Sequence, residues 1–338
     1  MVWPEGAYEG TVMDIEVVPG MGPVYYGSYV VADDSGTEAR RAAVWYGLDA
    51  QPVQVGPAGT AWDIAFELTA SGQINGQSTV DESGRERAWV QDLRSGRLTW
   101  VDTDDAAEGI YVRRINDRGE AAGSVSYGGF TSDAVAWWPR VDRPGRVLPG
   151  GEDGVAEAWA INNQRTVAGS YAHYLPDYGF HVPQGALWSA RGDVTLLASN
   201  PGVGADTYAR LVTDRGQAAG NAWYGDIFDG HAEGARWPAP ARIESLGLLP
   251  GGGFSGVFGQ SAGGWVVGVA DHFDPDSPGA QDWGVVEHSV LWTDEPDVVR
   301  VLPSPYAVAQ GESDWRSWFG GPAHGAHTGL DQVPRRME

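Results

Sequence analysis

Four side chains that can exchange protons recur at one spacing in the second half of the sequence. Tyr127, His173, Tyr224 and His272 each lie four residues after a glycine that ends a short apolar run. Tyrosine and histidine both donate and accept hydrogen bonds, and histidine changes its charge near neutral pH. The pattern predicts acid–base chemistry on a small molecule, with the histidines as general acid and base and the tyrosines as hydrogen-bond donors.

Further polar side chains follow three of these positions, in long segments at 172–185, 224–234 and 270–288. These segments are rich in histidine and aspartate, which orient a polar substrate or stabilise a positive charge. We therefore predict a set of substrate-binding residues there: Asp177, Tyr178, His181, Asp226, Asp229, His231 and Asp271.

The last of these segments also brings three carboxylates close together in the sequence. Asp271, Asp274 and Asp276 are hard oxygen ligands of the kind that calcium prefers. The glycine and the distal glutamate of an EF-hand loop do not fall at the right places, and no two histidines have the spacing of a tight metal site. We predict no bound transition metal and no organic cofactor, with calcium as the only candidate ion.

Several residue types and motifs are absent, which removes whole classes of chemistry. The 338-residue chain has neither cysteine nor lysine, so it cannot form disulfides, use a thiolate or form a lysine Schiff base. It also lacks a GxSxG motif, a phosphate-binding glycine loop and a dinucleotide fingerprint. The formal net charge of −23 argues against a nucleic-acid partner, because phosphate neutralisation requires a basic surface.

The N-terminal residues MVWPEGAYEG contain no basic region followed by an apolar stretch, and no apolar run is long enough to span a membrane. We therefore expect a cytoplasmic protein, or a secreted one if a leader has been removed. We also expect a monomer that binds a small-molecule ligand and contacts no membrane.

The glycines that precede the proton-carrying residues belong to a repeat that covers most of the chain. Two copies read INDRGEAAGS at 115–124 and INNQRTVAGS at 161–170. The repeated glycine occurs six times at intervals of 46 to 51 residues, a period typical of propeller blades: Gly27, Gly76, Gly123, Gly169, Gly220 and Gly268. A second glycine stands four residues earlier in four copies and predicts a tight hairpin with positive φ: Gly72, Gly119, Gly216 and Gly264.

Each repeated glycine is followed by a short run that contains tryptophan, then by a turn and another apolar run. Every unit therefore reads as strand, tight turn, strand, variable loop, strand, turn and strand. One large ring per unit would fill the wedge between neighbouring sheets, and we assign this packing role to five tryptophans: Trp45, Trp138, Trp188, Trp237 and Trp292. Aromatic residues near the starts of the first strands receive the same role: Trp62, Tyr111, Trp159, Tyr208 and Phe258.

These signals predict an all-β chain that folds as a six-bladed β-propeller of four-stranded antiparallel blades. The expected blades span about 11–56, 57–103, 104–149, 150–199, 200–250 and 251–302. The tail at 303–338 lacks both repeat signals. We expect it to pack on the propeller or to complete a neighbouring sheet, and not to form a seventh blade.

The unit resembles the HAF repeat, whose pattern is A-x-x-I-N-x-x-G-x-V-V-G followed by H-A-F-x-W. The first half is matched by AINNQRTVAG at 160–169 and RINDRGEAAG at 114–123, and the second most nearly by HSVLW at 288–292. The resemblance covers about residues 11–302 and implies a propeller-like fold, but its shared positions are structural and bring no catalytic residue. HAF-repeat proteins are usually described as probable extracellular proteins, and the missing secretion signal departs from that description.

The loops between the second and third strands lie on the same face as the connections between blades, and such loops commonly carry function. Two functions remain open. A non-redox enzyme would use the four proton-carrying residues as the wall of one pocket, for cyclisation, elimination, isomerisation or hydrolysis. A binding module would use the acidic, aromatic face to hold a protein partner or a carbohydrate, with the four rings only completing the blade cores.

Overall fold

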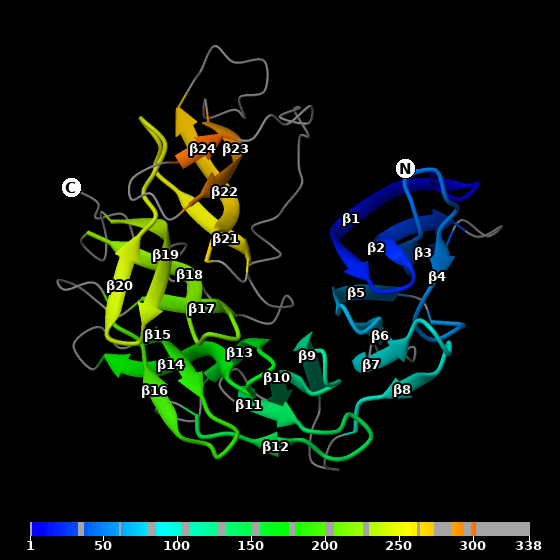
Figure 1. The fold of residues 1–338 in the computed structure, drawn as a ribbon, viewed down its shortest axis with the longest axis horizontal. Coiled ribbons are helices and arrows are strands. Elements are labelled where there is room, and N and C mark those ends of the chain that lie inside the picture. Colours follow the sequence, from blue (N-terminus) through cyan, green and yellow to red (C-terminus); the bar gives the residue numbers. More distant parts are fainter. Residues whose placement is uncertain are drawn as a thin grey trace, which may run out of the picture.

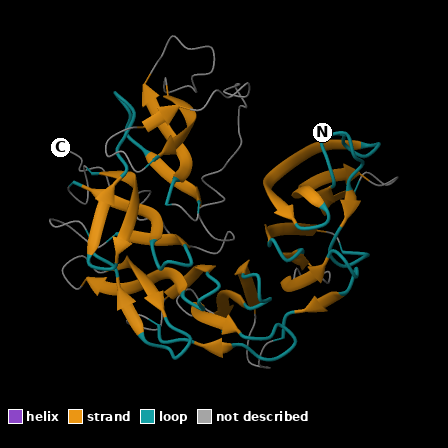
Figure 2. Cartoon of the chain, viewed as in Figure 1, coloured by secondary structure: helices purple, strands orange, loops and turns teal. Residues whose placement is uncertain are grey.

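The computed structural model describes residues 2–32, 37–60, 62–79, 86–102, 109–127, 133–150, 156–175, 180–199, 206–225, 230–261, 264–273, 285–293 and 299–301. These residues form 24 β-strands and no helix (Figure 2). Consequently, no helix in this part of the chain is long and apolar enough to cross a membrane. The all-β prediction is confirmed for the described residues.

The strands follow the chain in consecutive units of four. Unit 1 contains β1 (Ala7–Val18), β2 (Gly22–Ala32), β3 (Glu38–Trp45) and β4 (Val53–Gln54). Unit 2 contains β5 (Trp62–Leu68), β6 (Gln73–Thr79), β7 (Glu86–Asp92) and β8 (Leu98–Trp100). Unit 3 contains β9 (Gly109–Ile115), β10 (Ala121–Ser126), β11 (Asp133–Trp138) and β12 (Arg146–Val147).

The second half of the chain repeats this organisation. Unit 4 contains β13 (Ala156–Ile161), β14 (Val167–Leu175), β15 (Phe180–Trp188) and β16 (Val194–Leu196). Unit 5 contains β17 (Thr207–Val212), β18 (Ala218–Tyr224), β19 (His231–Ala239) and β20 (Arg242–Ser245). Unit 6 contains β21 (Ser255–Gln260), β22 (Val266–Phe273), β23 (Val285–Trp292) and β24 (Val299–Val301).

Within each unit, neighbouring strands pair antiparallel in chain order. Units 3 to 6 are separate four-stranded sheets, whereas one parallel bridge between Arg40 and Trp62 joins units 1 and 2 into an eight-stranded sheet. The units follow one another around an arc, with β5, β9, β13, β17 and β21 toward its middle (Figure 1). Units 1 and 6 stand at the two ends of this arc.

The repeated glycine faces a β-bulge in the first strand of its own unit. In unit 4, Gly169 pairs with Ala158 and the next pair is Ala168 with Ala160, so Trp159 is the extra residue. A Cβ atom on Gly169 would lie 1.8 Å from the backbone oxygen of Glu157. The same clash, at 1.7 to 2.2 Å, would occur at the other five repeated glycines. Glycine recurs there because the bulge leaves no room for a side chain.

The asparagine of the repeated phrase closes one hairpin and joins it to the next. The side-chain oxygen of Asn162 accepts hydrogen bonds from the backbone of Gln164 and Thr166, and its Nδ2 donates to the backbone oxygen of Thr213 in unit 5 at 2.7 Å. Asn116 makes the equivalent turn bonds in unit 3 and donates to the backbone oxygen of Asn162 at 3.0 Å. The asparagine therefore recurs because each copy closes its own hairpin and donates a hydrogen bond to the backbone of the following unit.

The predicted positive-φ glycines are confirmed in all four hairpins, with φ between 75° and 95° at Gly72, Gly119, Gly216 and Gly264. Unit 4 has Arg165 at this position, with a φ of 66° that a side chain adopts only at a cost. Arg165 Nε donates to Glu120 Oε1 of unit 3 at 2.8 Å. This charge-assisted bond offsets part of the strain and again ties neighbouring units together.

The predicted packing role of the third-strand tryptophans is confirmed. Each of the five is at most 2% exposed: Trp45, Trp138, Trp188, Trp237 and Trp292. In units 3, 4 and 5 the indole N–H donates to a backbone oxygen of the incoming connection at 2.7 to 2.8 Å. In unit 1, Trp45 donates instead to Val2, so the N-terminal segment takes the place of a connection.

The aromatic residues near the starts of the first strands do not form the equivalent core that their even spacing predicts. The β-bulge interrupts the two-residue period, so Trp159 and Phe258 are bulge residues whereas Tyr111 and Tyr208 lie two residues before a bulge. Phe258 is 44% exposed, and the other four, Trp62, Tyr111, Trp159 and Tyr208, are only partly buried. Their position on the inner strands, rather than in a core, makes them candidates for ligand contact.

Candidate functional site

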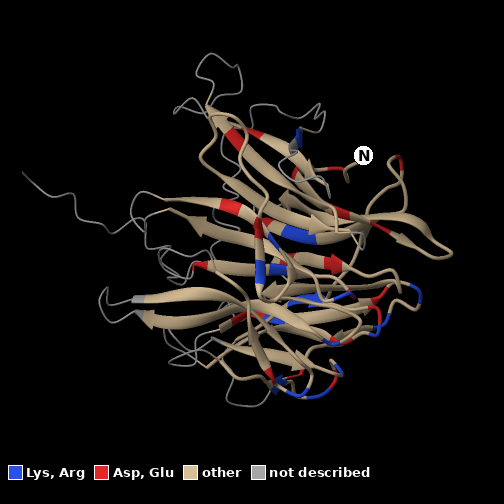
Figure 3. Cartoon of the chain, turned by 60° about the vertical axis from the view of Figure 1, so that its left-hand side comes forward, with Lys and Arg blue, Asp and Glu red and all other residues tan. Residues whose placement is uncertain are grey.

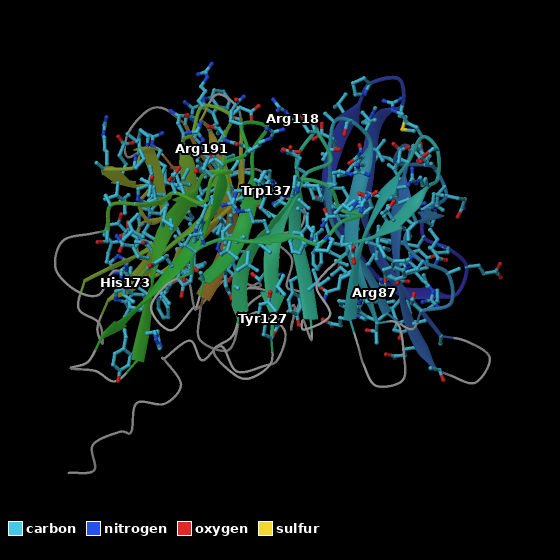
Figure 4. The ribbon with its side chains drawn as sticks, turned by 90° about the horizontal axis from the view of Figure 1, so that it is seen from below. Arg87, Arg118, Tyr127, Trp137, His173 and Arg191 are labelled. Atoms are coloured by element: carbon cyan, nitrogen blue, oxygen red, sulfur yellow. The ribbon has the colours of Figure 1, made fainter. Side chains whose placement is uncertain are left out.

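The four proton-carrying residues lie at the ends of second strands, on the strand faces that also carry the buried tryptophans. Figure 4 shows Tyr127 and His173 at one end of the molecule, with Arg118 and Arg191 of the tight turns at the opposite end. The buried part of each of these faces packs toward the preceding unit, whereas Tyr127, at the end of its strand, is 36% exposed.

The partners of His173 lie within unit 4. Its Nε2 atom is 2.9 Å from Gln184 Oε1, and the Gln184 amide donates to the backbone oxygen of Leu197 at 2.8 Å. The rings of His173 and Tyr171 are 5.3 Å apart. His181, a predicted substrate-binding residue, packs on Tyr174 with 5.2 Å between ring centroids.

Tyr224 belongs to a polar network confined to unit 5. His231 Nε2 lies 2.5 Å from Glu233 Oε1, and the other oxygen of Glu233 accepts a hydrogen bond from Ser245. The Tyr224 ring stacks on His231 at 6.3 Å. Burial, together with the nearby Glu233 carboxylate, raises the pKa of Tyr224 to about 12. Tyr224 is therefore a proton donor in hydrogen bonds and not a base at neutral pH.

His272 forms a pair with His288 in unit 6. The two rings stack at 4.8 Å, and His272 Nδ1 is 2.9 Å from His288 Nε2. Burial and the neighbouring His272 lower the pKa of His288. Asp271 has a structural task, because its Oδ1 accepts backbone hydrogen bonds from Gly253 and Phe254 at 2.8 and 2.7 Å.

Six predicted site or calcium residues lie outside the described residues: Asp177, Tyr178, Asp226, Asp229, Asp274 and Asp276. The tail at 303–338 lies outside them as well. The residues that are described hold no cluster of three or more potential metal ligands. The shared pocket of Tyr127, His173, Tyr224 and His272 stays a prediction, since the contacts of the latter three are with their own units.

A different set of polar residues comes together on the inner strands of units 3, 4 and 5. The bulge residues of these strands are Arg113, Trp159 and Arg210. Each guanidinium carbon lies 4.7 Å from the Trp159 ring, so the indole receives one arginine from each neighbouring unit. Arg113 also lies 6.0 Å from the rings of Phe66 and Tyr111. Such cation–π contacts hold the two charges in place.

Glu157, Asp206 and Tyr208 lie beside these side chains. We call the following seven residues the inner cluster: Tyr111, Arg113, Glu157, Trp159, Asp206, Tyr208 and Arg210. Glu157 and Tyr208 occupy equivalent positions, two residues before their bulges. Asp206 precedes β17 and is hydrogen-bonded to Tyr208. The cluster therefore contains both signs of charge, as do the described strands and turns elsewhere (Figure 3).

Burial changes the acid–base properties of the inner cluster. It raises the pKa of Asp206 to about 6, against a smaller lowering by the hydrogen bond from Tyr208. Burial also raises the pKa of Tyr208 well above its ordinary value, and the Asp206 and Glu157 charges add to that rise. The pKa of Arg210 falls to about 10 because of burial, so Arg210 stays charged at neutral pH. Asp206 is thus a carboxyl group that titrates close to neutral pH.

The buried atoms of the inner cluster without a hydrogen-bond partner include Asp206 Oδ1 and Trp159 Nε1. A buried polar atom left in this state costs free energy, about 1–3 kcal/mol by mutational measures. Such groups are uncommon in folded proteins and are found at sites that carry function.

The inner cluster was missed at the sequence level, although a signal for it exists. Units 3 and 5 share a Tyr-x-Arg sequence, Tyr111 to Arg113 and Tyr208 to Arg210, and unit 4 has Glu157 and Trp159 at the same two positions. The spacing suggests one strand face. Arg113, Trp159 and Arg210 each lie ten residues before their repeated glycine, so the spacing aligns them, whereas the bulge and the stacking of the side chains are seen only in the structure.

No protein-family model and no curated protein matches this sequence. Solved structures do match it. The β-propeller domain of the Trilobed protease from Pyrococcus furiosus, reported to have an open velcro topology, is 11% identical with a TM-score of 0.58 over 88% of this chain and 84% of its own. This chain has a β-propeller fold. A Pyrococcus horikoshii acylaminoacyl peptidase is 12% identical, with a TM-score of 0.55 over 88% of this chain.

The propeller spans 46% of that acylaminoacyl peptidase, about half of its length. In both relatives the likeness concerns the fold alone, because sequence identity is so low. Among the described residues, β1 pairs with β2 and β24 with β23, each within its own unit.

Proposed function

We propose that the inner cluster binds a small organic molecule and that Asp206 with Tyr208 performs acid–base chemistry on it without a redox cofactor. The observation that carries this proposal is the Asp206 carboxyl group, whose pKa is raised to about 6 by burial and whose Oδ1 atom has no hydrogen-bond partner. General acids and bases work best when their pKa lies near the working pH. This function keeps the reaction classes expected from the sequence and moves them to different residues.

Arg113, Trp159 and Arg210 supply the recognition. The two guanidinium groups favour a ligand with an anionic group, and their stacking on the indole fixes their orientation before the ligand arrives. Preorganised charges of this kind lose less entropy on binding than mobile surface arginines do. The Tyr208 hydroxyl, protonated at neutral pH, then donates to the reacting group or to Asp206.

The test is equilibrium dialysis of the purified protein against a metabolite extract, followed by mass spectrometry of the retained and altered compounds. The wild type is expected to enrich at least one anionic compound, and Arg113→Gln and Arg210→Gln are expected to lose it. Arg191→Gln, an exposed arginine of a tight turn, is the matched control and should behave as the wild type. Equal enrichment by all four proteins would contradict a site at the inner cluster.

Catalysis is tested in the same samples by following compounds that disappear with time. Turnover by the wild type and its loss in Asp206→Asn, with the bound compound still retained, supports the acid–base role. Retention without turnover in the wild type would support the alternative function, a non-catalytic binding propeller. That alternative is favoured by the acylaminoacyl peptidase likeness, in which the propeller matches about half of a larger chain.

We further propose that the six units close into a ring. The first-strand residue that pairs with the repeated glycine is at most 1% exposed in units 2 to 6, whereas its equivalent in unit 1, Val12, is 37% exposed. The residue before the glycine is buried in units 1 to 5, whereas Val267 of unit 6 is 40% exposed. In the other units, the residues equivalent to Val12 and Val267 pack against a neighbouring unit. Contact between units 6 and 1 would bury Val12 and Val267 in the same way.

A further inference from the structure

Unit 6 departs from the repeat at one position of its first strand that faces the preceding unit. The second residue after the bulge is a buried aliphatic residue in units 2, 3 and 4: Leu68, Ile115 and Ile161. Unit 6 has Gln260 there, paired with Val266, which packs against unit 5. A polar amide at a position built for apolar contact costs free energy unless a partner satisfies it.

A cavity of about 190 Å³ lies at this position, between units 5 and 6. Its polar lining consists of Gln217, Arg236, Arg242, Glu244 and Gln260. Gln217 follows the first hairpin of unit 5, and Arg242 follows the turn between β19 and β20. The cavity therefore lies at the tight-turn end, where Figure 4 shows Arg118 and Arg191, away from Tyr127 and His173.

Two amide oxygens in the lining are buried without a hydrogen-bond partner, Gln217 Oε1 and Gln260 Oε1. They come from different units and meet at the same cavity. Rotation about the last side-chain bond turns either the oxygen or the NH2 group of each amide toward the cavity. A ligand with hydrogen-bonding groups would satisfy both amides at once.

The charges around the cavity leave a net positive lining. Arg236 Nε donates to Glu244 Oε2 at 2.6 Å, and Arg236 also donates to the backbone oxygen of Thr293 in unit 6. Arg242 pairs with the other oxygen of Glu244, and its side chain is 69% exposed at the rim. One carboxylate therefore stands between two guanidinium groups, which leaves donor capacity for a second carboxylate.

We propose that this cavity is a second binding site, for a small organic acid that also carries an amino or hydroxyl group. Arg242 receives the carboxylate, and the amides of Gln217 and Gln260 receive the amino or hydroxyl group. A cavity of about 150 Å³ holds a benzene-sized molecule, so this one suits a ligand of about ten non-hydrogen atoms or fewer. The site is independent of the inner cluster and of any reaction there.

The binding test uses four probes in isothermal titration calorimetry with the full chain: L-glutamate, L-malate, propionate and ethanolamine. L-Glutamate or L-malate is expected to bind with a Kd below about 10 mM, the range of a weak but specific small ligand. Propionate lacks the donor group and ethanolamine lacks the carboxylate, so each should bind about tenfold more weakly or not at all. Equal binding of all four probes, or of none, would overturn the proposal.

Two variants place the site. Gln260→Leu restores the residue type of Leu68 and replaces an unsatisfied amide by an apolar group of similar size, so it should abolish binding and raise the melting temperature. Arg242→Gln changes only an exposed rim residue and should weaken binding about tenfold without changing the fold. Gln164→Leu, an exposed glutamine in a tight turn of unit 4, is the matched control and should bind as the wild type does. Binding that survives both Gln260→Leu and Arg242→Gln would show that the probes bind elsewhere.

Discussion

Two buried aspartates differ in how far their surroundings offset the burial of a carboxyl group. Asp63 is fully buried, but its Oδ1 accepts hydrogen bonds from the hydroxyls of Thr60 and Ser78, and Arg41 lies 3.6 Å from its other oxygen. Asp206 has the Tyr208 hydroxyl as a partner, while its Oδ1 has none. Asp63 Oδ2 also lacks a hydrogen-bond partner and burial raises the pKa of Asp63, but the two hydroxyls and the Arg41 charge oppose that rise. Asp206 has only the Tyr208 hydroxyl to oppose the same effect.

Replacing Asp206 with asparagine is expected to stabilise the protein at neutral pH. The pKa of Asp206 is about 6 in the folded chain and 3.8 in the unfolded chain. Between these two pH values the folded state therefore binds more protons than the unfolded state. Stability is therefore lost as the pH rises from about 4 to about 6, by about 3 kcal/mol in total. Asparagine is not charged, keeps an acceptor for Tyr208 and avoids this loss.

Urea unfolding at pH 8 and pH 5 measures this effect. Asp206→Asn should be more stable than the wild type by about 3 kcal/mol at pH 8 and by about half of that at pH 5. Asp49→Asn, at an exposed position, should change stability little at either pH. A stability gain that does not depend on pH would show that Asp206 is charged in both states, which would remove the main support for its acid–base role.

The element that organises each unit is the bulge in its first strand. It decides where glycine must recur, because the repeated glycine lies against a backbone oxygen of the bulged strand. It also leaves one residue of each first strand without a partner in the second strand. These extra residues are Met13, Phe66, Arg113, Trp159, Arg210 and Phe258. The same feature thus explains a structural signature and positions the inner cluster.

Replacing Gly169 with alanine should therefore destabilise the protein strongly. The new Cβ would lie 1.8 Å from the backbone oxygen of Glu157, so the first and second strands of unit 4 must separate. We expect a loss of about 3 kcal/mol or more, the range of severe core disruption. Thermal and urea unfolding measure it. Gly253→Ala, where a Cβ meets nothing within 4 Å, is the matched control and should cost little; equal losses would contradict the bulge explanation.

The sequence was sufficient to predict the strands, the hairpin glycines and the buried tryptophans, because each depends on residue types at a fixed spacing. It was not sufficient to predict the bulges, because a recurring glycine has several structural causes and does not by itself indicate an inserted residue in the partner strand. Even spacing from Gly169 and Gly123 therefore grouped Trp159 with Tyr111, although the structure makes Trp159 equivalent to Arg113. Trp159 and Arg113 both lie ten residues before their repeated glycine, but a pattern built on aromatic residues alone does not align an arginine with an indole.

At the scale of the whole molecule, the open question is contact between units 6 and 1. The residue before the repeated glycine packs against the next unit in clusters such as that of Ala122 with Ala158, and that of Ala219 with Val257. The equivalent pair across the two ends of the arc is Val267 with Val12, and both are exposed. Placing apolar residues at both positions is what a closed ring requires, and an arc that remained open would leave them in water.

A double variant, Val12→Cys with Val267→Cys, tests ring closure. The chain has no cysteine of its own, so a disulfide can form only between the two introduced residues. If the ring closes as we propose, these positions approach as closely as Ala158 approaches Ala122, and mild oxidation should cross-link most of the protein within one chain. Val12→Cys with Val147→Cys, which uses an exposed valine of β12, is the control and should remain reduced. Gel mobility without reductant separates the cross-linked from the linear chain. Failure of the first pair to cross-link, in a protein whose melting temperature is unchanged, would mean that units 1 and 6 stay apart and that the ring is open in solution.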